Sequence, residues 1–463
     1  MAVMTATPFP SLRSPRYPDT EAAISALESD GVTTVIGTVV NPAGLTHAKT
    51  ISVARLGAFA DPGLGASPVW HVFAIDQAGV VVGDGISPVG DERIRIDLSA
   101  LHVLGDGLAW APGSFFHQDG SPDPYCSRGV LDRVEQRLAA ANLEALVGHE
   151  MEFVLVGPDG SALPSGMWAQ YGLAGVLEFE GFVTDVTEDA VRCGVAIEQF
   201  HPEYGANQFE VSLAPRSPVT AADHLVLMRI IVGRAARRHG MRVSLSPVPF
   251  AGKVGSGAHQ HFSLRGADGP LFSGGLGEHA MTAAGESAVA GLLMGLPDAQ
   301  GVLCGSILSG LRIAPGMWSG AYVCWGTDNR EAAVRFVPGG PSNPHGANVE
   351  VKIVDPSANP YLASAAILGL ALNGIERQVV LGPETIVDPA TMTDEQRADA
   401  AIRLLPAAQA DVIAGLAGSS LMRDVLGDEV VNAITAVRRY EHENFGALPV
   451  DELAEKFRLS WSV

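Results

Sequence analysis

The sequence has few of the features expected of a nucleic-acid-binding protein or of a cysteine-stabilised one. Its 463 residues include 30 Lys and Arg against 51 Asp and Glu, for a formal net charge of −21. Nucleic-acid binding normally requires an excess of basic residues, so nucleic acid is not expected as a partner. The four cysteines are widely spaced and form no CxxC pair, which argues against a thiolate zinc site or a disulfide framework.

Long apolar runs and targeting segments are also lacking. The longest apolar stretches, such as 365–372, fall far short of the ~20 residues that span a bilayer. The first twenty residues contain several prolines and no apolar run, unlike a signal peptide. We therefore expect a cytoplasmic protein with no membrane association. Hydrophobic residues make up 47% of the chain, enough for a sizeable core spread over more than one domain.

The spacing of apolar residues predicts a strand-rich N-terminal part followed by alternating strands and helices. A helix is expected after Asp19, then strands over 33–40, 71–76, 79–84 and 94–99. A loop over 113–129 leads into an amphipathic helix over 130–141, and we place a domain boundary at about residue 115, giving domains 1–115 and 116–463. The second domain is predicted to contain strands over 145–156, 207–215, 242–247, 259–264, 332–337 and 348–354, helices over 219–238, 282–296 and 359–376, and a mainly helical segment 395–463.

Charged residues interrupt several of the apolar strands. Residues i and i+2 of a strand face the same side, so Glu150 and Glu152 share one face. The same alternation places His259, His261 and Ser263 together, and Glu350 with Lys352. Glu210 interrupts another apolar strand, and Glu203 lies seven residues before it.

Carboxylates on apolar strands cost free energy unless they are paired or bind a metal ion. Oxygen-rich sites suit Mg²⁺ or Mn²⁺, and two such ions could hold a polyphosphate. For any single strand, a polar face turned to water is an alternative, and Glu350 with Lys352 could form a surface ion pair. The repetition on four strands favours a metal site built from Glu150, Glu152, Glu203, Glu210, His259 and Glu350.

Three arginines lie in or beside apolar segments and could balance the negative charge of these carboxylates. Arg330 and Arg335 lie near the two ends of a predicted strand, and Arg312 precedes a Pro-Gly loop. Arginine suits phosphate and carboxylate, although each could form a surface salt bridge instead. The sequence has no GxxxxGK[ST] loop, no strand–GxGxxG–helix unit and no HExxH motif. A nucleotide site would therefore depend on metal ions and arginines.

Six polar motifs are distributed along the chain: GHEMEF (148–153), EQFHPEYGANQFE (198–210), GSGAHQHFS (255–263), SGLRIAPG (309–316), DNREAAVR (328–335) and VEVKIVDPSANPYL (349–362). They occur in the order found in bacterial type I glutamine synthetases, and the chain resembles that family along nearly its whole length. The resemblance implies an α+β fold, with an N-terminal β-grasp domain and a catalytic α/β domain that has a curved antiparallel sheet. It also implies a dodecamer of two hexameric rings, in which the N-terminal domain completes a neighbour's active site.

The resemblance also implies roles for individual residues and two or three Mg²⁺ or Mn²⁺ ions per site. One ion would be held by Glu152, Glu203 and Glu210, and another by Glu150, His259 and Glu350. ATP would contact Glu198, His261, Ser263, Arg330 and Arg335, and glutamate would contact Glu152, Gly255, Arg312 and Lys352. Arg330, Glu203 and Arg312 are the expected catalytic residues. The implied reaction forms γ-glutamyl phosphate from ATP, and a nitrogen nucleophile then attacks it.

Three positions depart from the family pattern. Asn41 and Trp318 stand where the match places an ammonium-binding aspartate and a flap glutamate, and Lys352 stands where an arginine is usual. Two lost anions should weaken capture of NH₄⁺, and a tryptophan offers an apolar or cation–π surface instead. Asn41 and Trp318 are therefore the predicted amine pocket. The adenylylated tyrosine loop of some members has no evident match, so that regulation is not expected.

These features predict an ATP-dependent γ-glutamyl-amide ligase that joins glutamate to a primary amine. The amine would be ethanolamine or a polyamine such as spermine, spermidine or putrescine, because the chain resembles γ-glutamylpolyamine and γ-glutamylethanolamide synthetases. Three alternatives remain: an ordinary glutamine synthetase, an inactive regulatory or structural ring protein, and an unrelated metal-dependent amidohydrolase. The identity of the amine and the choice between Mg²⁺ and Mn²⁺ stay open.

Overall fold

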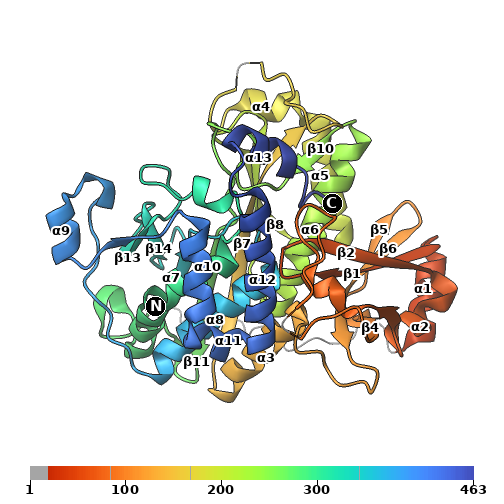
Figure 1. Cartoon of the computed structure of the whole chain (residues 1–463), viewed down its shortest axis with the longest axis horizontal. Coiled ribbons are helices and arrows are strands. Elements are labelled where there is room, and N and C mark those ends of the chain that lie inside the picture. The colour runs from red at the N-terminus through yellow and green to blue at the C-terminus, as the bar shows by residue number, and fades with distance from the viewer. Residues whose placement is uncertain (1–18, 84, 167, 344) are drawn as a thin grey trace.

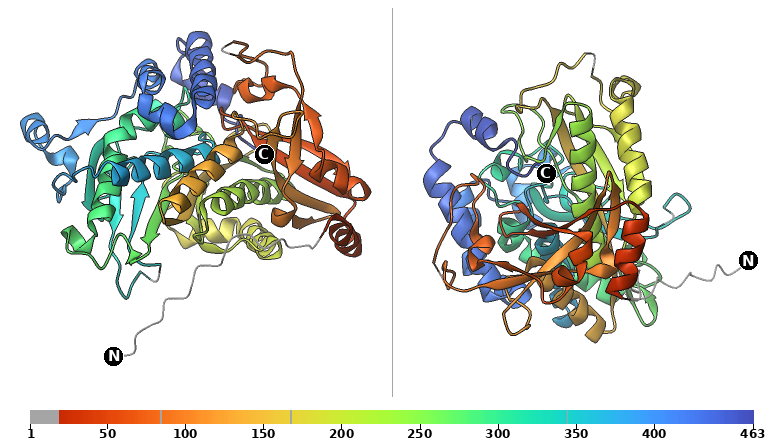
Figure 2. Two further views of the ribbon diagram at one scale, coloured as in Figure 1. Left: turned by 90° about the horizontal axis from the view of Figure 1, so that it is seen from below. Right: turned by 90° about the vertical axis from the view of Figure 1, so that its right-hand side faces the viewer.

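A computed structural model describes residues 19–83, 85–166, 168–343 and 345–463. The N-terminal part forms a small sheet at one side of a larger sheet that is covered by helices (Figure 1, Figure 2). The combination of helices with largely antiparallel sheets confirms the predicted α+β class. No helix in these ranges is long and apolar enough to cross a membrane.

The N-terminal sheet has six strands within the described residues, in the order β2-β1-β6-β4-β3, with β5 beside β6. Strands β1 and β6 are parallel and the other pairs are antiparallel. The predicted first helix is α1 (Thr20–Ser29), and the side chain of Asp19 caps it by accepting from the Ala22 amide at 2.8 Å. The strands are β1 (Thr34–Val40), β2 (Thr46–Ser52), β3 (Leu64–Ala66), β4 (Glu92–Ile96), β5 (His102–Gly105) and β6 (Leu108–Phe116).

Two of the strands predicted for this part are wrong. Segment 71–76 begins inside the 3-10 helix η2 (Pro68–Val72), and 79–83 forms only isolated bridges, such as Phe73 with Val80; Asp84 lies outside the described residues. Val72 and Ile75 are instead buried in the main core. The apolar residues of this segment therefore reflect burial and not pairing in a strand. Strand β6 extends to Phe116, through the expected start of the loop and past residue 115. The domain boundary itself remains a prediction.

The larger sheet has ten strands within the described residues, in the order β16-β13-β14-β15-β11-β7-β9-β8, with β10 beside β7 and β12 beside β11. Only β13 and β14 pair in parallel there, and most of the predicted strands of this domain are confirmed. The strands are β7 (Glu144–Val156), β8 (Ile197–Pro202), β9 (Gln208–Leu213), β10 (Arg242–Ser244), β11 (Gln260–Gly266), β12 (Gly269–Pro270), β13 (Tyr322–Thr327), β14 (Ala332–Val337), β15 (Asn348–Val351) and β16 (Arg403–Leu404).

Three long helices cover this sheet, and their prediction is largely confirmed. They are α6 (Pro218–Arg238), α7 (Ala283–Leu303) and α8 (Pro360–Glu376). Helix α7 runs past the predicted end at 296 and contains Pro297. The other helices are α2 (Leu56–Ala60), α3 (Ser127–Ala140), α4 (Leu173–Glu178), α5 (Glu180–Cys193), α9 (Asp394–Asp399), α10 (Gln409–Gly418), α11 (Ser420–Leu426), α12 (Asp428–Phe445) and α13 (Val450–Phe457).

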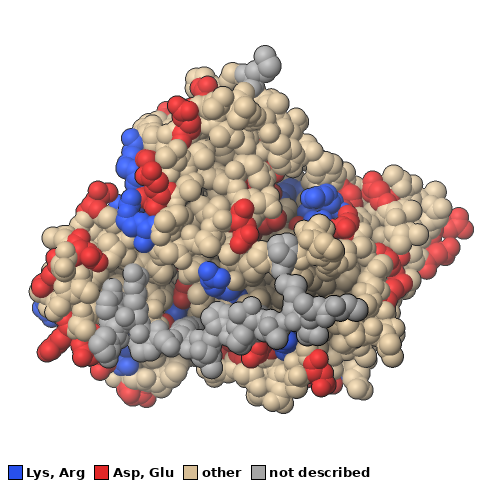
Figure 3. Space-filling view, turned by 180° about the vertical axis from the view of Figure 1, so that it is seen from behind, with Lys and Arg blue, Asp and Glu red and all other residues tan. Residues whose placement is uncertain are grey.

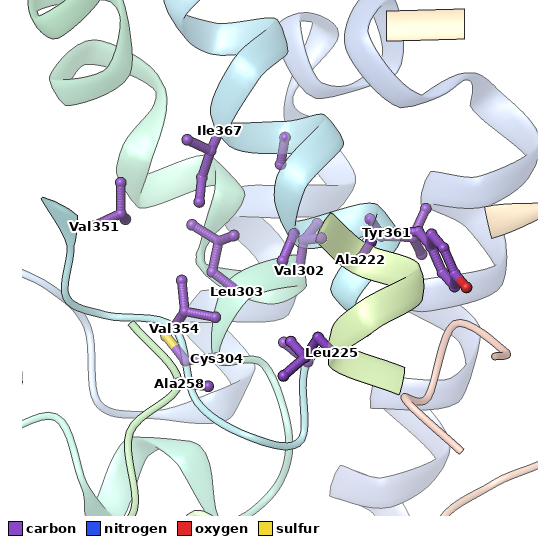
Figure 4. Close-up of a cluster of buried hydrophobic side chains, with 14 of the residues drawn as sticks. Ala222, Leu225, Ala258, Val302, Leu303, Cys304, Val351, Val354, Tyr361 and Ile367 are labelled. Carbon is purple, nitrogen blue, oxygen red and sulfur yellow. The ribbon is translucent and has the colours of Figure 1, made fainter. Parts of the chain in front are cut away.

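The main core lies between these helices and the buried face of the larger sheet. Helices α7 and α8 approach so closely that a Cβ on Gly291 would lie 2.4 Å from the Cα of Gly374, so glycine is required there. Figure 4 shows Leu303 of α7, Ile367 of α8 and Val351 of β15 among the side chains of this core. Burying Val351 turns its neighbour Glu350 to the opposite face of the sheet.

The surface reflects the acidic composition. On the face shown in Figure 3, acidic side chains are spread widely and basic side chains form small separate groups. This distribution favours solubility, and the described residues on that face form no extended basic patch that could bind a polyanion.

Candidate active site

Five neighbouring strands bring polar side chains to one face of the larger sheet. In the order β15-β11-β7-β9-β8, Glu350 lies directly opposite His261, Glu152 opposite Glu210, and Glu210 opposite His201. Directly opposite residues point to the same side of a sheet. The opposite face of β7 places Met151 and Phe153 in the core. The register of the strands therefore gathers residues that lie as much as two hundred positions apart.

The centre of the cluster is formed by Glu150, His259 and His261. One carboxylate oxygen of Glu150 lies 3.0 Å from Nδ1 of His259, and the other lies 3.4 Å from Nε2 of His261. Nδ1 of His259 is also 3.4 Å from Glu350. The His261 ring is oriented by a 2.8 Å contact between its Nδ1 and the side-chain oxygen of Asn348.

A second group of ligands lies next to this centre, toward β8. Nδ1 of His201 is 3.6 Å from Glu203, and Nε2 of the same ring is 3.5 Å from Glu210. Both carboxylates are almost fully buried. The sequence prediction missed His201, although its position two residues before Glu203 is the signal that could have found it.

The structure brings the predicted ligands together but groups them differently from the prediction. Three sets have ligand atoms within 4.8 Å of one another: Glu150, His261 and Glu350; Glu150, Glu210 and His259; and His201, Glu203 and Glu210. Glu152 belongs to none of them, and one of its oxygens accepts from the Gln208 amide at 3.0 Å. Carboxylate oxygens with imidazole nitrogens suit a hard divalent cation such as Mg²⁺ or Mn²⁺.

The charges of the cluster are unbalanced in the chain alone. Burial, followed by the nearby carboxylates Glu150, Glu152 and Glu203, raises the pKa of Glu210 to about 8. Burial and the Glu152 carboxylate also raise the pKa of Glu203. Burial would likewise raise the pKa of Glu150, but hydrogen bonds with His259 and His261 outweigh it and hold that pKa well below its usual range. Bound cations would remove this repulsion between carboxylates.

Glu350 is the best neutralised carboxylate of the cluster. It accepts from Nζ of Lys352 and from Arg335, each at 3.1 Å. Burial opposes ionisation of Glu350, but Lys352 and the two histidines lower its pKa to about 2. The alternative of a surface ion pair between Glu350 and Lys352 is wrong, because both side chains are almost completely buried. Lys352, predicted to hold glutamate, has the Glu350 carboxylate as its direct partner.

Arg312 is fixed beside the cluster on the side predicted to bind glutamate. Its guanidinium donates to the carbonyls of Ile353 and Lys352, each at 3.1 Å, and lies 3.3 Å from Nε2 of His259. A Cβ on Gly257 would approach His259, Arg312 and Glu152 to within 2.8 Å, so the glycine keeps a space open among these three groups. A Cβ on Gly255 would contact the Arg312 side chain at 3.2 Å.

Two of the predicted nucleotide residues, His261 and Arg335, contact carboxylates of the cluster. Arg335 bridges Glu350 and Asp328, with the second contact at 2.8 Å. Arg330 is exposed just before β14, and Ser263 follows His261 on the same face of β11. Glu198 is exposed at the start of β8, 3.3 Å from the His345 ring.

A row of aromatic rings flanks the Glu203 side of the cluster. The centroid of the Trp318 ring lies 5.1 Å from that of Tyr204, which lies 5.8 Å from that of Tyr171. Burial and the neighbouring Glu203 carboxylate raise the pKa of the Tyr171 hydroxyl, so this hydroxyl lies close to that carboxylate. Trp318 is 46% exposed, so the row combines a reachable π surface with a carboxylate. The sequence prediction identified Trp318 but missed both tyrosines.

The structure does not bring Asn41 into an accessible position. Its side chain is 2% exposed, donates to the Phe73 carbonyl at 2.9 Å and accepts from the Leu45 amide at 3.0 Å. Its own carbonyl accepts from Asn359, the cap of α8, at 2.9 Å. These contacts give Asn41 a structural role between the two sheets, and they do not favour its predicted part in an amine pocket.

The comparisons with known proteins agree with this geometry. The chain matches the family model "Glutamine synthetase, catalytic domain" over residues 124–454. It is 36% identical to a γ-glutamylpolyamine synthetase, GlnA3, of Streptomyces coelicolor, over 97% of this chain and 98% of that protein. It is 30% identical to a glutamine synthetase of Pyrococcus abyssi over 74% of this chain and 77% of that protein.

Solved structures of similar fold include a glutamine synthase homologue with a TM-score of 0.83 and 28% identity, which covers 93% of this chain and 99% of the homologue. A complex named GmaS/ADP has a TM-score of 0.81 and 25% identity, covering 92% of this chain and 96% of the other. The family match over most of the chain and the shared fold agree with the arrangement of carboxylates, histidines and arginines on the larger sheet. The chain therefore belongs to the glutamine synthetase family and is a ligase of that family.

Proposed function

We propose that this ligase joins the γ-carboxyl group of glutamate to a primary organic amine at the expense of ATP, with polyamines as the preferred class. The observation that carries the proposal is the row of Tyr171, Tyr204 and Trp318 beside the Glu203 carboxylate. Aromatic faces attract organic cations, and a nearby carboxylate adds electrostatic attraction. The similarity to a γ-glutamylpolyamine synthetase supports the same class of amine.

The cluster of carboxylates and histidines would hold two or three Mg²⁺ or Mn²⁺ ions. When bound, the ions would neutralise the phosphate charges of ATP and stabilise charge during phosphoryl transfer. The residues predicted to contact the nucleotide are Glu198, His261, Ser263, Arg330 and Arg335. The fold shared with a protein that was solved as an ADP complex supports nucleotide binding at this site.

Glutamate would lie on the Arg312 side of the cluster. The fixed guanidinium, the backbone at Gly255 and the space kept open by Gly257 favour a small carboxylate ligand there. An oxygen of its γ-carboxylate would bond to the γ-phosphorus of ATP as the bond to ADP breaks. The phosphate of the acyl phosphate then leaves as the amine nitrogen bonds to the carbonyl carbon of the γ-carboxyl group.

The amine must reach this carbon as a neutral nucleophile and lose a proton on becoming an amide. Glu203 is the carboxylate at the aromatic side of the cluster, so we assign it to receive the ammonium group and its proton. Arg330, which is exposed just before β14, would stabilise the charge of the transferred phosphoryl group. The aromatic row then contacts the carbon chain of the amine, which ammonium lacks.

The test is phosphate release with glutamate and ATP across ammonium, ethanolamine, putrescine, spermidine, spermine and simple alkylamines. We expect kcat/KM to be highest for a polyamine and lowest for ammonium. The highest value for ammonium would indicate an ordinary glutamine synthetase. Absence of turnover with every amine would favour a regulatory or structural protein, and amide hydrolysis without ATP would indicate an amidohydrolase.

We also propose that the chain assembles into a dodecamer of two hexameric rings. The resemblance of its motifs to type I glutamine synthetases supports this assembly. Native mass spectrometry should give a mass twelve times the 48.2 kDa of one chain. A stable monomer or dimer with full activity would overturn the assembly proposal without affecting the proposed reaction.

A further inference from the structure

A second cluster of ligand-type side chains lies outside the active site, beneath the N-terminal sheet. His71 of η2, Glu92 of β4 and Asp123 of the segment between β6 and α3 converge there. Nε2 of His71 lies 3.1 Å from a Glu92 oxygen and 3.3 Å from an Asp123 oxygen. The exposed fractions of the three side chains are 2%, 7% and 0%.

The hydrogen bonds within this cluster do not satisfy all its members. A single proton on Nε2 of His71 can be donated to only one of the two carboxylates at full strength. The hydrogen bond formed by the ring is the one with Glu92. The Oδ2 atom of Asp123 is buried and has no hydrogen-bond partner among the described residues, although it points at the same nitrogen. An unsatisfied buried carboxylate oxygen is costly unless a cation completes its environment. Burial opposes protonation of His71, but Asp123 and Glu92 raise its pKa, so either the imidazolium or a bound metal ion can be that cation.

The spacing of the three ligand atoms matches coordination of a metal ion. Ligands at the ~2.0–2.1 Å bond lengths of zinc in a tetrahedral site lie about 3.3 Å from one another. The two distances from His71 Nε2 are 3.1 and 3.3 Å. The third pair of ligand atoms, one from each carboxylate, lies within 4.8 Å. The cluster therefore presents one imidazole nitrogen and two carboxylate oxygens to a common point.

Aromatic side chains enclose this point. The ring of Phe115 lies 4.4 Å from the His71 ring, and Tyr125 stacks on it with centroids 5.3 Å apart. The second oxygen of Asp123 accepts from the Tyr125 backbone amide at 2.8 Å, which fixes the orientation of the carboxylate. A buried, pre-oriented set of ligands with an apolar wall is the arrangement of a structural metal site.

We propose that His71, Glu92 and Asp123 bind one divalent transition-metal ion of the zinc class. The ion would join three segments, namely η2, the first residue of β4 and the approach to α3, whose cap is Cys126. It would thereby fix the N-terminal sheet against the start of the catalytic part. This site is independent of the proposed reaction, because none of its ligands belongs to the active-site cluster.

The test measures zinc retained by the full-length protein. Metal-free protein is loaded with Zn²⁺, dialysed against metal-free buffer and analysed for metal content. Wild type should retain one Zn²⁺ per chain more than Glu92→Gln, which conserves shape but removes a ligand charge. The active-site control Glu210→Gln should keep this ion, whatever zinc it loses from the active-site cluster. Cobalt substitution should give the strong visible absorption of a tetrahedral site in wild type and lose it in Glu92→Gln.

Two results would overturn the proposal. One is wild-type protein that retains no zinc under these conditions. The other is as much zinc in Glu92→Gln as in wild type, with less in Glu210→Gln, which would place the ion in the active site. If Glu92→Gln fails to fold, anomalous diffraction at the zinc edge from wild-type crystals decides the question. Density at His71 supports the site, and zinc density only elsewhere rejects it.

Discussion

The ammonium group of Lys352 lies 3.1 Å from the carboxylate of Glu350, with both side chains almost completely buried. The pair stands inside the active-site cluster, because the same carboxylate also contacts Arg335 and lies 3.4 Å from His259. A buried carboxylate with two cationic partners is stable as an anion even before metal ions bind. Lys352 therefore neutralises the cluster directly.

Replacing Lys352 with methionine should destabilise the metal-free protein. Breaking a buried ion pair leaves an uncompensated charge and costs about 3 kcal/mol, and Arg335 remains as a partial partner. Denaturant unfolding in EDTA should show the loss, and Mg²⁺ should recover part of it. Lys352→Arg is the matched control, because it keeps the charge. Equal stability of wild type and Lys352→Met in EDTA would show that Arg335 alone neutralises Glu350.

The contribution of Glu210 to the stability of the metal-free protein should fall as the pH rises from about 5 to 8. The pKa of Glu210 is about 8 in the folded chain against an ordinary value of 4.5, so the folded state binds more protons across this range. The pKa of His261, raised to about 9 by Glu150 against the effect of burial, acts in the same direction. Thermal unfolding in EDTA measures the slope.

Glu210→Gln should flatten that slope, because the neutral side chain does not titrate. The same variant should be at least as stable as wild type at pH 8 without metal, yet bind Mg²⁺ at least tenfold more weakly. Mg²⁺ should reduce the pH dependence of wild type, since the ion replaces the protons. An unchanged slope in Glu210→Gln would locate the proton uptake elsewhere in the molecule.

Asn41→Asp should reduce stability and leave amine preference unchanged. The substitution replaces the amide that donates to the Phe73 carbonyl with a buried carboxylate facing that carbonyl. The lost donor and the buried charge should cost about 2–3 kcal/mol. Denaturant unfolding with and without Mg²⁺, together with the ratio of kcat/KM for spermine over ammonium, separates the two effects. A shift of that ratio toward ammonium would restore Asn41 to the amine pocket.

Strand alternation was sufficient to predict most of the residues that converge in the carboxylate–histidine cluster. A charged residue on an apolar strand is rare enough to indicate a site. Glu150, His259 and Glu350 meet in the cluster, as expected. Alternation says nothing about which strands are neighbours. The order β15-β11-β7-β9-β8 decides that Glu210 meets His259 and His201, so the predicted division into two ligand sets did not follow from the sequence.

The place of a residue in a motif did not reveal whether its side chain is buried, and burial limits what the side chain can contact. Asn41 lies at the end of β1 in a turn, and only the docking of Asn359 against this turn shows that its amide is already engaged. Tyr171 and Tyr204 lie in a loop and at a strand end, where no periodicity marks them. Their contact with Trp318 and Glu203 arises from tertiary packing between distant segments.

Trp318 should control the choice between organic amines and ammonium. Its ring contacts Tyr204 and is 46% exposed, so removing it changes the amine surface with little cost to the fold. A cation–π contact contributes about 0.5–2 kcal/mol. Trp318→Ala should therefore lower kcat/KM for polyamines by roughly twofold to thirtyfold and leave that for ammonium nearly unchanged.

Two further substitutions at this position sharpen the test. Trp318→Phe, the matched control, keeps an aromatic face and should retain most of the polyamine activity. Trp318→Glu places an anion beside Tyr204 and Glu203 and should raise the use of ammonium relative to monoalkylamines, because small cations gain most from a point charge. Steady-state kinetics with spermine, butylamine and ammonium distinguish these effects. Identical ratios among the three variants and wild type would show that amine specificity lies outside the aromatic row.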